Sequence, residues 1–170
     1  ITDIASDNEL IKSTTGTMSL SGVDIKDNPR DAGTGALFRS AKHIVAQSLN
    51  VVNSKGILLQ AESGGDISLA DSTINESGDI IKQNGGAVVV RGVSVTGGGK
   101  LADMEDATSI FEAVTTNGGD GIKAVKSAVQ IERSDFKGHT NAPVHFDSRS
   151  CSKCKRELVI SETKFQDSNE

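Results

Sequence analysis

The chain contains 170 residues, of which 35% are hydrophobic and 24% are charged. This length supports one domain with its own core, and this composition excludes a disordered chain. The longest apolar runs, such as residues 87–90, are much too short for a membrane span, and the net charge of −5 argues against a nucleic-acid-binding surface over the whole protein. Trp and Tyr are absent, which predicts a core of small aliphatic side chains in thin, regular layers.

The first segment of the chain, residues 1–17, is polar and rich in threonine after Leu10 and Ile11. A solenoid leaves unpaired strand groups at its ends, and these ends need a cap. If the chain forms a solenoid, we expect residues 1–17 to cap one end.

Beyond this segment, one short pattern recurs six times. Residues that we expect to face a core stand at its start and two, five and seven positions later. A small residue suited to a turn stands at the tenth position in every copy but one, which has His139 there. The six copies start at Met18, Ile44, Ile67, Val88, Val129 and Leu158.

The spacing inside this pattern predicts short strands joined by corners. A step of two residues is typical of a strand with one buried face. A step of three leaves two consecutive residues pointing outward, as a bend in the chain does. No window keeps the three-and-four spacing of an amphipathic helix. A further short strand precedes most copies, at residues 36–38, 57–59, 80–81, 122–124 and 144–146.

Three short strands in each coil of roughly 20–30 residues indicate an all-β parallel solenoid of about seven coils. We expect residues 1–170 to form this single domain. Equivalent residues would stack at the spacing of paired strands, about 4.8 Å, so Phe136 and Phe165 should lie in neighbouring coils. An all-β sandwich is the alternative, but it gives no reason for the repeated spacing.

Two motifs carry a resemblance to a known fold family. Gly85-Gly86-Ala87-Val88 is similar to the Gly-Gly-Ala-Ile motif of polymorphic membrane protein passengers, and Ile25-Lys26-Asp27-Asn28 is similar to their Phe-x-x-Asn motif. With the repeats, residues 18–168 resemble the right-handed parallel β-helix (pectin-lyase-like) superfamily, which includes pectate lyases, phage tailspikes and autotransporter passengers. The resemblance implies a right-handed β-helix, and either an extracellular passenger or an enzyme that cleaves acidic polysaccharides.

Residues 97–116 are too long for the space between two copies of the pattern, and we expect an irregular coil or loop there. The segment forms either one degraded coil that uses Ile110 and Phe111, or a loop with a short helix over residues 101–113. Asp103, Glu105 and Asp106 make it acidic. Calcium prefers such oxygen ligands, but the EF-hand spacing is absent, so we favour a solvated acidic face.

A second long segment, residues 148–156, contains both cysteines, Cys151 and Cys154. In a secreted chain, a local disulfide is the simplest interpretation of this pair. Together with His139 and His145, the two thiolates would also complete a tetrahedral zinc site, although the histidines lie on opposite sides of a predicted strand. Free thiols are the third alternative. We favour ordinary turn and strand positions for the two histidines.

A glycosylation motif, Asn75-Glu76-Ser77, falls at a predicted corner. An Asn-x-Ser sequence accepts an N-linked glycan when it lies on the surface of a secreted eukaryotic protein. Asn75 is therefore the predicted attachment site, although one such motif in a chain of this length is near chance.

Charge is distributed unevenly along the chain. Residues 62–120 carry ten acidic and three basic side chains, and residues 123–156 carry eight basic and three acidic ones. In a solenoid these segments become neighbouring bands, which we call the acidic band and the basic band. Scattered solvated charge is the simpler interpretation. The sharper hypothesis is that the acidic band of one molecule binds the basic band of another, in a contact that salt weakens.

Two functions compete. An enzyme acting on acidic glycans needs clustered acids and bases on one face, and the best available set is Asp120 and Asp135 with Arg133 or Lys123. The absence of Trp and Tyr argues against a sugar groove, because such grooves commonly use aromatic faces.

We therefore expect a non-catalytic extracellular or cell-surface module, either a passenger-like adhesive stalk or a self-assembling filament subunit. Its partners would be copies of itself, other surface proteins or glycans. We expect no nucleic-acid partner, no membrane span and no cofactor, with zinc or calcium as the exceptions described above. A polysaccharide lyase or hydrolase is the alternative.

Overall fold

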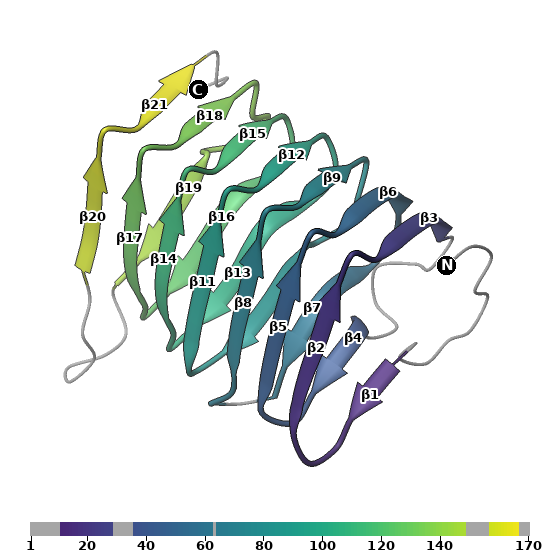
Figure 1. Ribbon diagram of the computed structural model, residues 1–170. Coiled ribbons are helices and arrows are strands. Elements are labelled where there is room, and N and C mark those ends of the chain that lie inside the picture. The colour runs from purple at the N-terminus through teal and green to yellow at the C-terminus, as the bar shows by residue number, and fades with distance from the viewer. Residues whose placement is uncertain (1–10, 29–35, 63, 149–156, 167–170) are drawn as a thin grey trace.

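A computed structural model describes residues 11–28, 36–62, 64–148 and 157–166. These residues form twenty-one strands and no helix. The strands make three parallel sheets of seven strands each, which we call sheets A, B and C (Figure 1). The chain visits the three sheets in turn, and one strand from each makes a rung. The sequence prediction of an all-β parallel solenoid is confirmed, and the sandwich alternative is excluded.

The strands of sheet A are β1 (Ile11–Ser13), β4 (Ala36–Ser40), β7 (Ile57–Ala61), β10 (Ile81–Asn84), β13 (Lys100–Glu105), β16 (Gly121–Val125) and β19 (Val144–Asp147). Those of sheet B are β2 (Thr17–Ser21), β5 (His43–Gln47), β8 (Asp66–Ala70), β11 (Ala87–Arg91), β14 (Thr108–Glu112), β17 (Ala128–Glu132) and β20 (Glu157–Ser161). Those of sheet C are β3 (Asp24–Asn28), β6 (Asn50–Ser54), β9 (Thr73–Asn75), β12 (Ser94–Thr96), β15 (Thr115–Asn117), β18 (Asp135–Lys137) and β21 (Lys164–Gln166).

The predicted copies of the pattern stack in one column on sheet B. Met18 pairs with Ile44, and Val129 pairs with Leu158. The strands expected before most copies lie in sheet A. In sheet C, the Phe136 and Phe165 rings stack with centroids 5.4 Å apart, which confirms that these residues occupy neighbouring rungs.

Residues 97–116 form one rung of three strands, with no helix and with a register shift between Lys100 and Ala102 where β13 pairs with β16. Strands β13, β14 and β15 pair with the rungs on both sides. Ser109 occupies the column between Val88 and Val129, so this rung is a seventh copy that starts with a polar residue. Phe111 is fully buried, but Ile110 points to the outer face, contrary to the expectation that both line the core.

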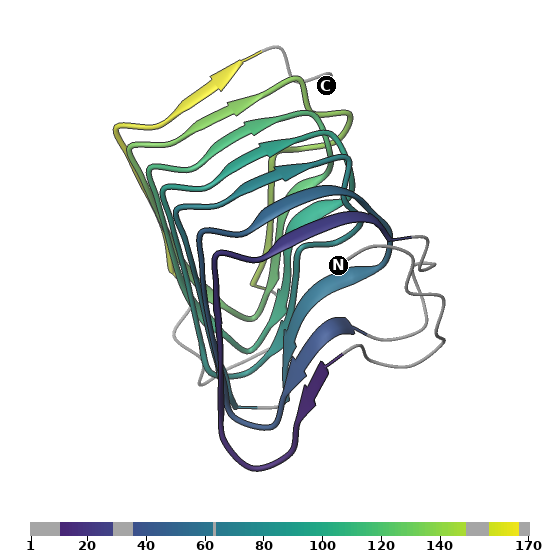
Figure 2. The same cartoon turned by 45° about the vertical axis from the view of Figure 1, so that its right-hand side comes forward.

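The core fills the space between the three sheets and runs the length of the stack (Figure 2). It consists mainly of Ile, Leu, Val and Ala, as the composition predicted. Three aromatic rings, Phe38, Phe111 and Phe136, are fully buried within it. Burial of apolar area on this scale is the main stabilising contribution to the fold.

The corner between sheets B and C has a left-handed backbone at one position in all seven rungs. The second of the two outward residues has a φ between +47° and +61° there. This conformation reverses the local bend so that the next strand again turns its apolar face inward. The residues are Gly22, Ser48, Asp71, Gly92, Ala113, Arg133 and Glu162.

On the core side of this corner, serine hydroxyls form hydrogen bonds with the backbone. The Ser134 hydroxyl donates to the Glu132 carbonyl at 2.8 Å and accepts the Val114 backbone N–H of the rung before at 3.1 Å. Ser72 makes the same two bonds, to Ala70 and from Leu49. A polar residue at this core-facing position therefore satisfies a backbone N–H at the bend, that of Leu49 or Val114, while the carbonyl that it binds also accepts a backbone N–H.

No helix among the described residues has the length and apolar character needed to cross a bilayer.

Candidate functional site

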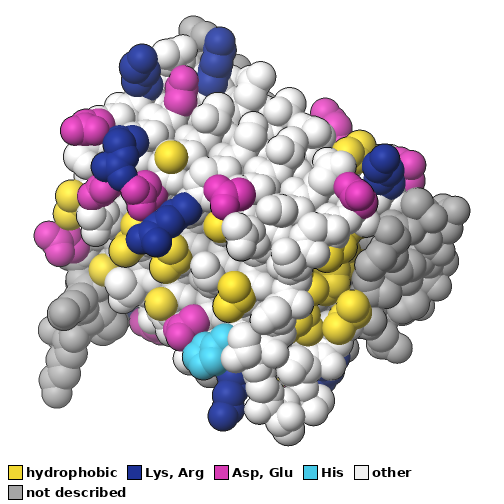
Figure 3. All heavy atoms as spheres, in the orientation of Figure 1, with side chains coloured by type: hydrophobic (Ala, Val, Ile, Leu, Met, Phe, Trp, Pro, Cys, Tyr) yellow, Lys and Arg dark blue, Asp and Glu magenta, His cyan; other side chains and the backbone are white. Residues whose placement is uncertain are grey.

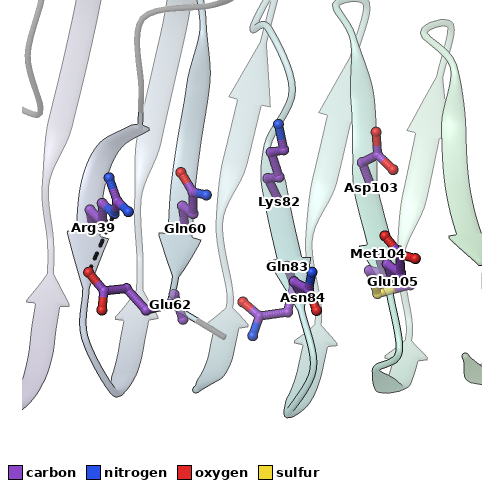
Figure 4. A pocket seen from close by; sticks show the side chains of 10 residues that line it. Arg39, Gln60, Glu62, Lys82, Gln83, Asn84, Asp103, Met104 and Glu105 are labelled. Carbon is purple, nitrogen blue, oxygen red and sulfur yellow. Dashed lines mark ion pairs between the residues drawn. The ribbon is translucent and has the colours of Figure 1, made fainter. Parts of the chain in front are cut away.

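A depression lies over sheet A and has a volume of about 520 Å³. Its walls come from β4, β7, β10 and β13, and its centre is a column of outward side chains (Figure 4). Arg39, Gln60, Lys82 and Asp103 occupy successive positions in this column, because the parallel register pairs each with the next.

Ion pairs neutralise most charges in this depression. Arg39 Nε lies 3.8 Å from Glu62 Oε1. Asp103 lies between two lysines, with its carboxylate oxygens 3.8 Å from Lys100 Nζ and 3.6 Å from Lys123 Nζ. Lys82 makes no ion pair with any described residue and extends into solvent (Figure 4).

A buried amide lies behind the depression. Gln83 is 3% exposed, and its Nε2 donates to the carbonyls of Gly65 at 2.6 Å and Gly85 at 2.8 Å. Its Oε1 is buried without a partner among the described residues. Gln83 therefore holds the chain of one rung to the next, and it does not extend into the depression.

The depression offers a ligand charged side chains and hydrogen-bonding amides. General acid–base catalysis needs a titratable group held within reach of the reacting atoms. The carboxylate at the centre of this depression, Asp103, is instead held by two ammonium groups. Lys82, with the amides of Gln60 and Asn84, suits an anionic or hydroxyl-rich ligand.

The predicted zinc ligands fall in different environments. His139 is 1% exposed, and both of its ring nitrogens are engaged: Nδ1 lies 3.1 Å from the Gly119 carbonyl, and Nε2 lies 2.7 Å from Thr116 Oγ1. Because a carbonyl only accepts, Nδ1 carries the proton and Nε2 accepts from the Thr116 hydroxyl. Burial lowers the pKa of His139, and the hydrogen bond to Gly119 opposes this effect more weakly.

His145 is exposed on the outer face of β19, beside Lys123. The wall of sheet A therefore separates it from the core that holds His139. Cys151 and Cys154 lie outside the described residues, so the disulfide, zinc and free-thiol alternatives all stay predictions. To coordinate a metal through Nε2, His139 would have to give up its hydrogen bond with Thr116.

The predicted glycosylation site, Asn75, ends β9 on the outer side of sheet C and is half-buried. The residue beside it inside the strand, Ile74, is fully buried. Attachment of a glycan at Asn75 stays a prediction.

Two acidic residues of 97–116, Asp103 and Glu105, pair with lysines of the next rung. Lys126 Nζ lies 2.9 Å from Glu105 Oε1, and this bond raises the pKa of Lys126. Within the described ranges, no three His, Cys, Asp or Glu side chains come together as a metal site would require.

The four residues proposed for polysaccharide cleavage do not form one cluster. Lys123 lies on sheet A and pairs with Asp103. The Asp120 carboxylate accepts a hydrogen bond from Asn141 Nδ2 at 2.7 Å. Arg133 and Asp135 line a different depression, at the corner between sheets B and C, with Lys164 and Glu162.

Arg133 bridges two acidic side chains that the register places opposite each other. Glu112 and Glu132 are direct neighbours in sheet B. Arg133 contacts the Glu112 carboxylate and lies 3.5 Å from Glu132 Oε2. Like charges directly opposite each other destabilise a sheet, so the arginine offsets that repulsion. Figure 3 shows side chains of opposite charge lying side by side on this face of the molecule.

No protein-family model, no curated protein and no solved structure matches the chain. The fold is thus established by the geometry of the chain, and the resemblance to passengers and pectin-degrading enzymes stays a hypothesis.

Proposed function

We propose that this protein is a non-catalytic structural module, a stiff β-solenoid segment of an extracellular or cell-surface protein. One observation carries the proposal: several described side chains that could do chemistry are bonded to neighbouring rungs. Asp103 binds Lys123, Glu112 binds Arg133, Asp120 binds Asn141, and His139 binds Thr116. Groups engaged in this way hold the stack together.

Pairs of an amide and a carboxylate support the same role. Asn50 Nδ2 donates to Asp24 Oδ1 at 2.8 Å, and Asn53 Nδ2 donates to Asp27 Oδ1 at 2.9 Å. Each pair joins successive rungs along an outer face, where an amide lies beside a carboxylate and no like charges meet. A rod assembled from short rungs depends on such nearest-neighbour contacts.

A double-mutant cycle on the buried Thr116–His139 pair tests this observation. We expect Thr116→Val and His139→Leu each to lower the free energy of unfolding, with a coupling of about 1 kcal/mol between them in urea denaturation. A matched cycle on Ser19 and His145, which share no contact, should show no coupling. The absence of coupling between Thr116 and His139 would remove the support for a rung-joining role.

A glycan-binding function is the second candidate, and the depression over sheet A favours it. Lys82, which makes no ion pair with any described residue, lies beside the amides of Gln60 and Asn84, and this arrangement suits an acidic sugar. Titration calorimetry with oligogalacturonate tests this function. Binding that Lys82→Ala abolishes and Lys26→Ala, on sheet C, leaves intact would establish it. The absence of heat with the wild-type protein would exclude it for this ligand.

A further inference from the structure

The outer face of sheet C carries two columns of uncharged polar side chains in its central rungs. Strands β9, β12 and β15 lie side by side in this sheet (Figure 1). The parallel register stacks their first residues in one column and their third residues in a second column. Each of these six residues carries a hydroxyl or an amide group. We call them the polar array: Thr73, Ser94 and Thr115 in the first column, and Asn75, Thr96 and Asn117 in the second.

The side chains of the polar array are not engaged within the described protein. None of the six makes a hydrogen bond or an ion pair with a described residue. The rung before the array differs, since Asn50 Nδ2 donates to Asp24 Oδ1 there. The rung after it is charged, with Asp135 and Lys137 next in the two columns. The donors and acceptors of the array are therefore open to an uncharged partner outside the chain.

The backbone beneath the polar array is held firmly. The middle residues of the three strands, Ile74, Val95 and Thr116, face the core with exposures of 0%, 4% and 1%. Each strand also pairs with a neighbour on both sides. Three of the six side chains are threonines, whose branching at Cβ restricts their rotation. The array is thus organised before it binds, and little conformational entropy remains to be lost.

The array repeats in two directions that resemble the lattice of ice. Successive rungs lie about 4.8 Å apart, and outward residues along one strand lie about 6.6 Å apart. Water molecules that are hydrogen-bonded tetrahedrally at about 2.8 Å repeat about every 4.5 Å within a layer and about every 7.4 Å across layers. Over three rungs the mismatch along the solenoid is only about 0.6 Å, and across the two columns it is about 0.8 Å. Rotation of the side chains accommodates differences of this size.

We propose that the polar array binds ice. An ice surface has no net charge and presents hydrogen-bond donors and acceptors at fixed positions, so it complements a rigid, uncharged array of hydroxyls and amides. The contacts would be made through waters of the lattice, and such hydrogen bonds are nearly as favourable as direct ones. This inference goes beyond the structural role proposed above, and it holds whether or not the depression over sheet A binds a glycan.

Ice recrystallisation in a frozen sucrose solution tests the proposal. We expect the wild-type protein to stop the growth of ice grains at micromolar concentration. Thr96→Lys should raise the required concentration at least about tenfold, because the lattice cannot hydrate the new charge. The matched substitution Thr108→Lys, at an exposed residue on the outer face of sheet B, should leave it unchanged. Thermal melting followed by circular dichroism shows whether both variants are folded.

Partition into slowly growing ice gives a second measurement, which needs only the wild-type protein. The protein should be enriched in the ice fraction relative to an unrelated globular protein. A glycan at Asn75 would cover the array, so both assays use protein from a host that does not glycosylate it.

Three results would overturn the proposal. The first is a wild-type protein that ice excludes and that does not slow grain growth at any soluble concentration. The second is an equal effect of Thr96→Lys and Thr108→Lys on grain growth. The third is retention of the wild type on crystalline cellulose without any effect on ice, which would assign the array to a flat polysaccharide surface instead.

Discussion

Glycines at the corners of the solenoid differ in what they must accommodate. Gly98 has a φ of +89°, and a Cβ built on it would lie 1.9 Å from the Ser77 carbonyl oxygen of the rung before. Gly22 has a φ of +61° with nothing within 4 Å, and Ala113 occupies the equivalent position four rungs later with a φ of +53°. Close approach of two backbones, and not φ alone, therefore requires glycine at residue 98.

We predict that Gly98→Ala lowers the free energy of unfolding by about 2 kcal/mol or more. The new Cβ would force the backbone near Ser77 to move, and alanine would also have to adopt the strained positive φ. Gly22→Ala should cost only about 1 kcal/mol, the penalty of a left-handed alanine. Urea denaturation of the two variants beside the wild type measures both values. Equal losses would show that the contact with Ser77 does not determine the effect.

His139 makes the stability of the fold depend on pH. Its pKa is lowered in the folded state, chiefly by burial, so folding favours the neutral ring. An unfolded histidine has a pKa of about 6.5. The contribution of neutral His139 is therefore complete above that pH and is lost as the pH falls below it toward the folded pKa.

We predict that the wild-type melting temperature falls more steeply between about pH 7.5 and 5.5 than that of His139→Gln. The difference between the two proteins isolates this residue, since the other two histidines, His43 and His145, are present in both. Parallel melting curves over this range would contradict the assigned role of burial.

At the scale of single elements, the corner serines allow a sharp comparison. Ser134→Ala removes the acceptor of the buried Val114 N–H, and we predict a loss of about 1–3 kcal/mol in the free energy of unfolding. Ser68→Ala, on the outer face of β8, should change it by less than about 0.5 kcal/mol. Denaturation midpoints measure both, and a tolerated Ser134→Ala would show that the corner does not need the hydroxyl.

The sequence predicted the strands of sheets B and C better than the rung at residues 97–116. In six rungs the repeated pattern on sheet B starts with an apolar residue, but in this rung it starts with Ser109. The Ser109 hydroxyl donates to the Ala128 carbonyl at 3.2 Å. A pattern that requires an apolar residue at its start therefore does not match this rung. The same rung has Thr116 at a core position, where its partner is His139. Ser109 and Thr116 are both polar residues whose hydrogen-bond partners belong to the next rung, so the pairing becomes visible only when the rungs are stacked.

The depression over sheet A was missed for a related reason. Each of its central side chains follows an apolar pair in the short strand, as in Leu58-Leu59-Gln60 and Ile80-Ile81-Lys82. This signal marks an outward residue in each coil. It does not show that these residues form one column, because the coils differ in length and the register between them comes from the backbone pairing.

For the whole molecule, the acidic and basic bands meet inside one chain. Lys123, Lys126 and Arg133 of the basic band bind Asp103, Glu105 and Glu112 of the acidic band in the neighbouring rung. These contacts satisfy part of the charge that would otherwise be available to another molecule. Binding between the bands of two molecules stays a prediction.

The proposed structural role requires that the protein has no catalytic activity, and an activity assay tests this requirement most directly. The purified protein is incubated with polygalacturonate and other acidic polysaccharides, with and without calcium, and unsaturated products and new reducing ends are followed. We predict that neither rises above the level of a heat-denatured control, because the groups suited to such chemistry join rungs. Product formation by the wild type that is lost in Arg133→Gln or Lys82→Ala would contradict the structural role.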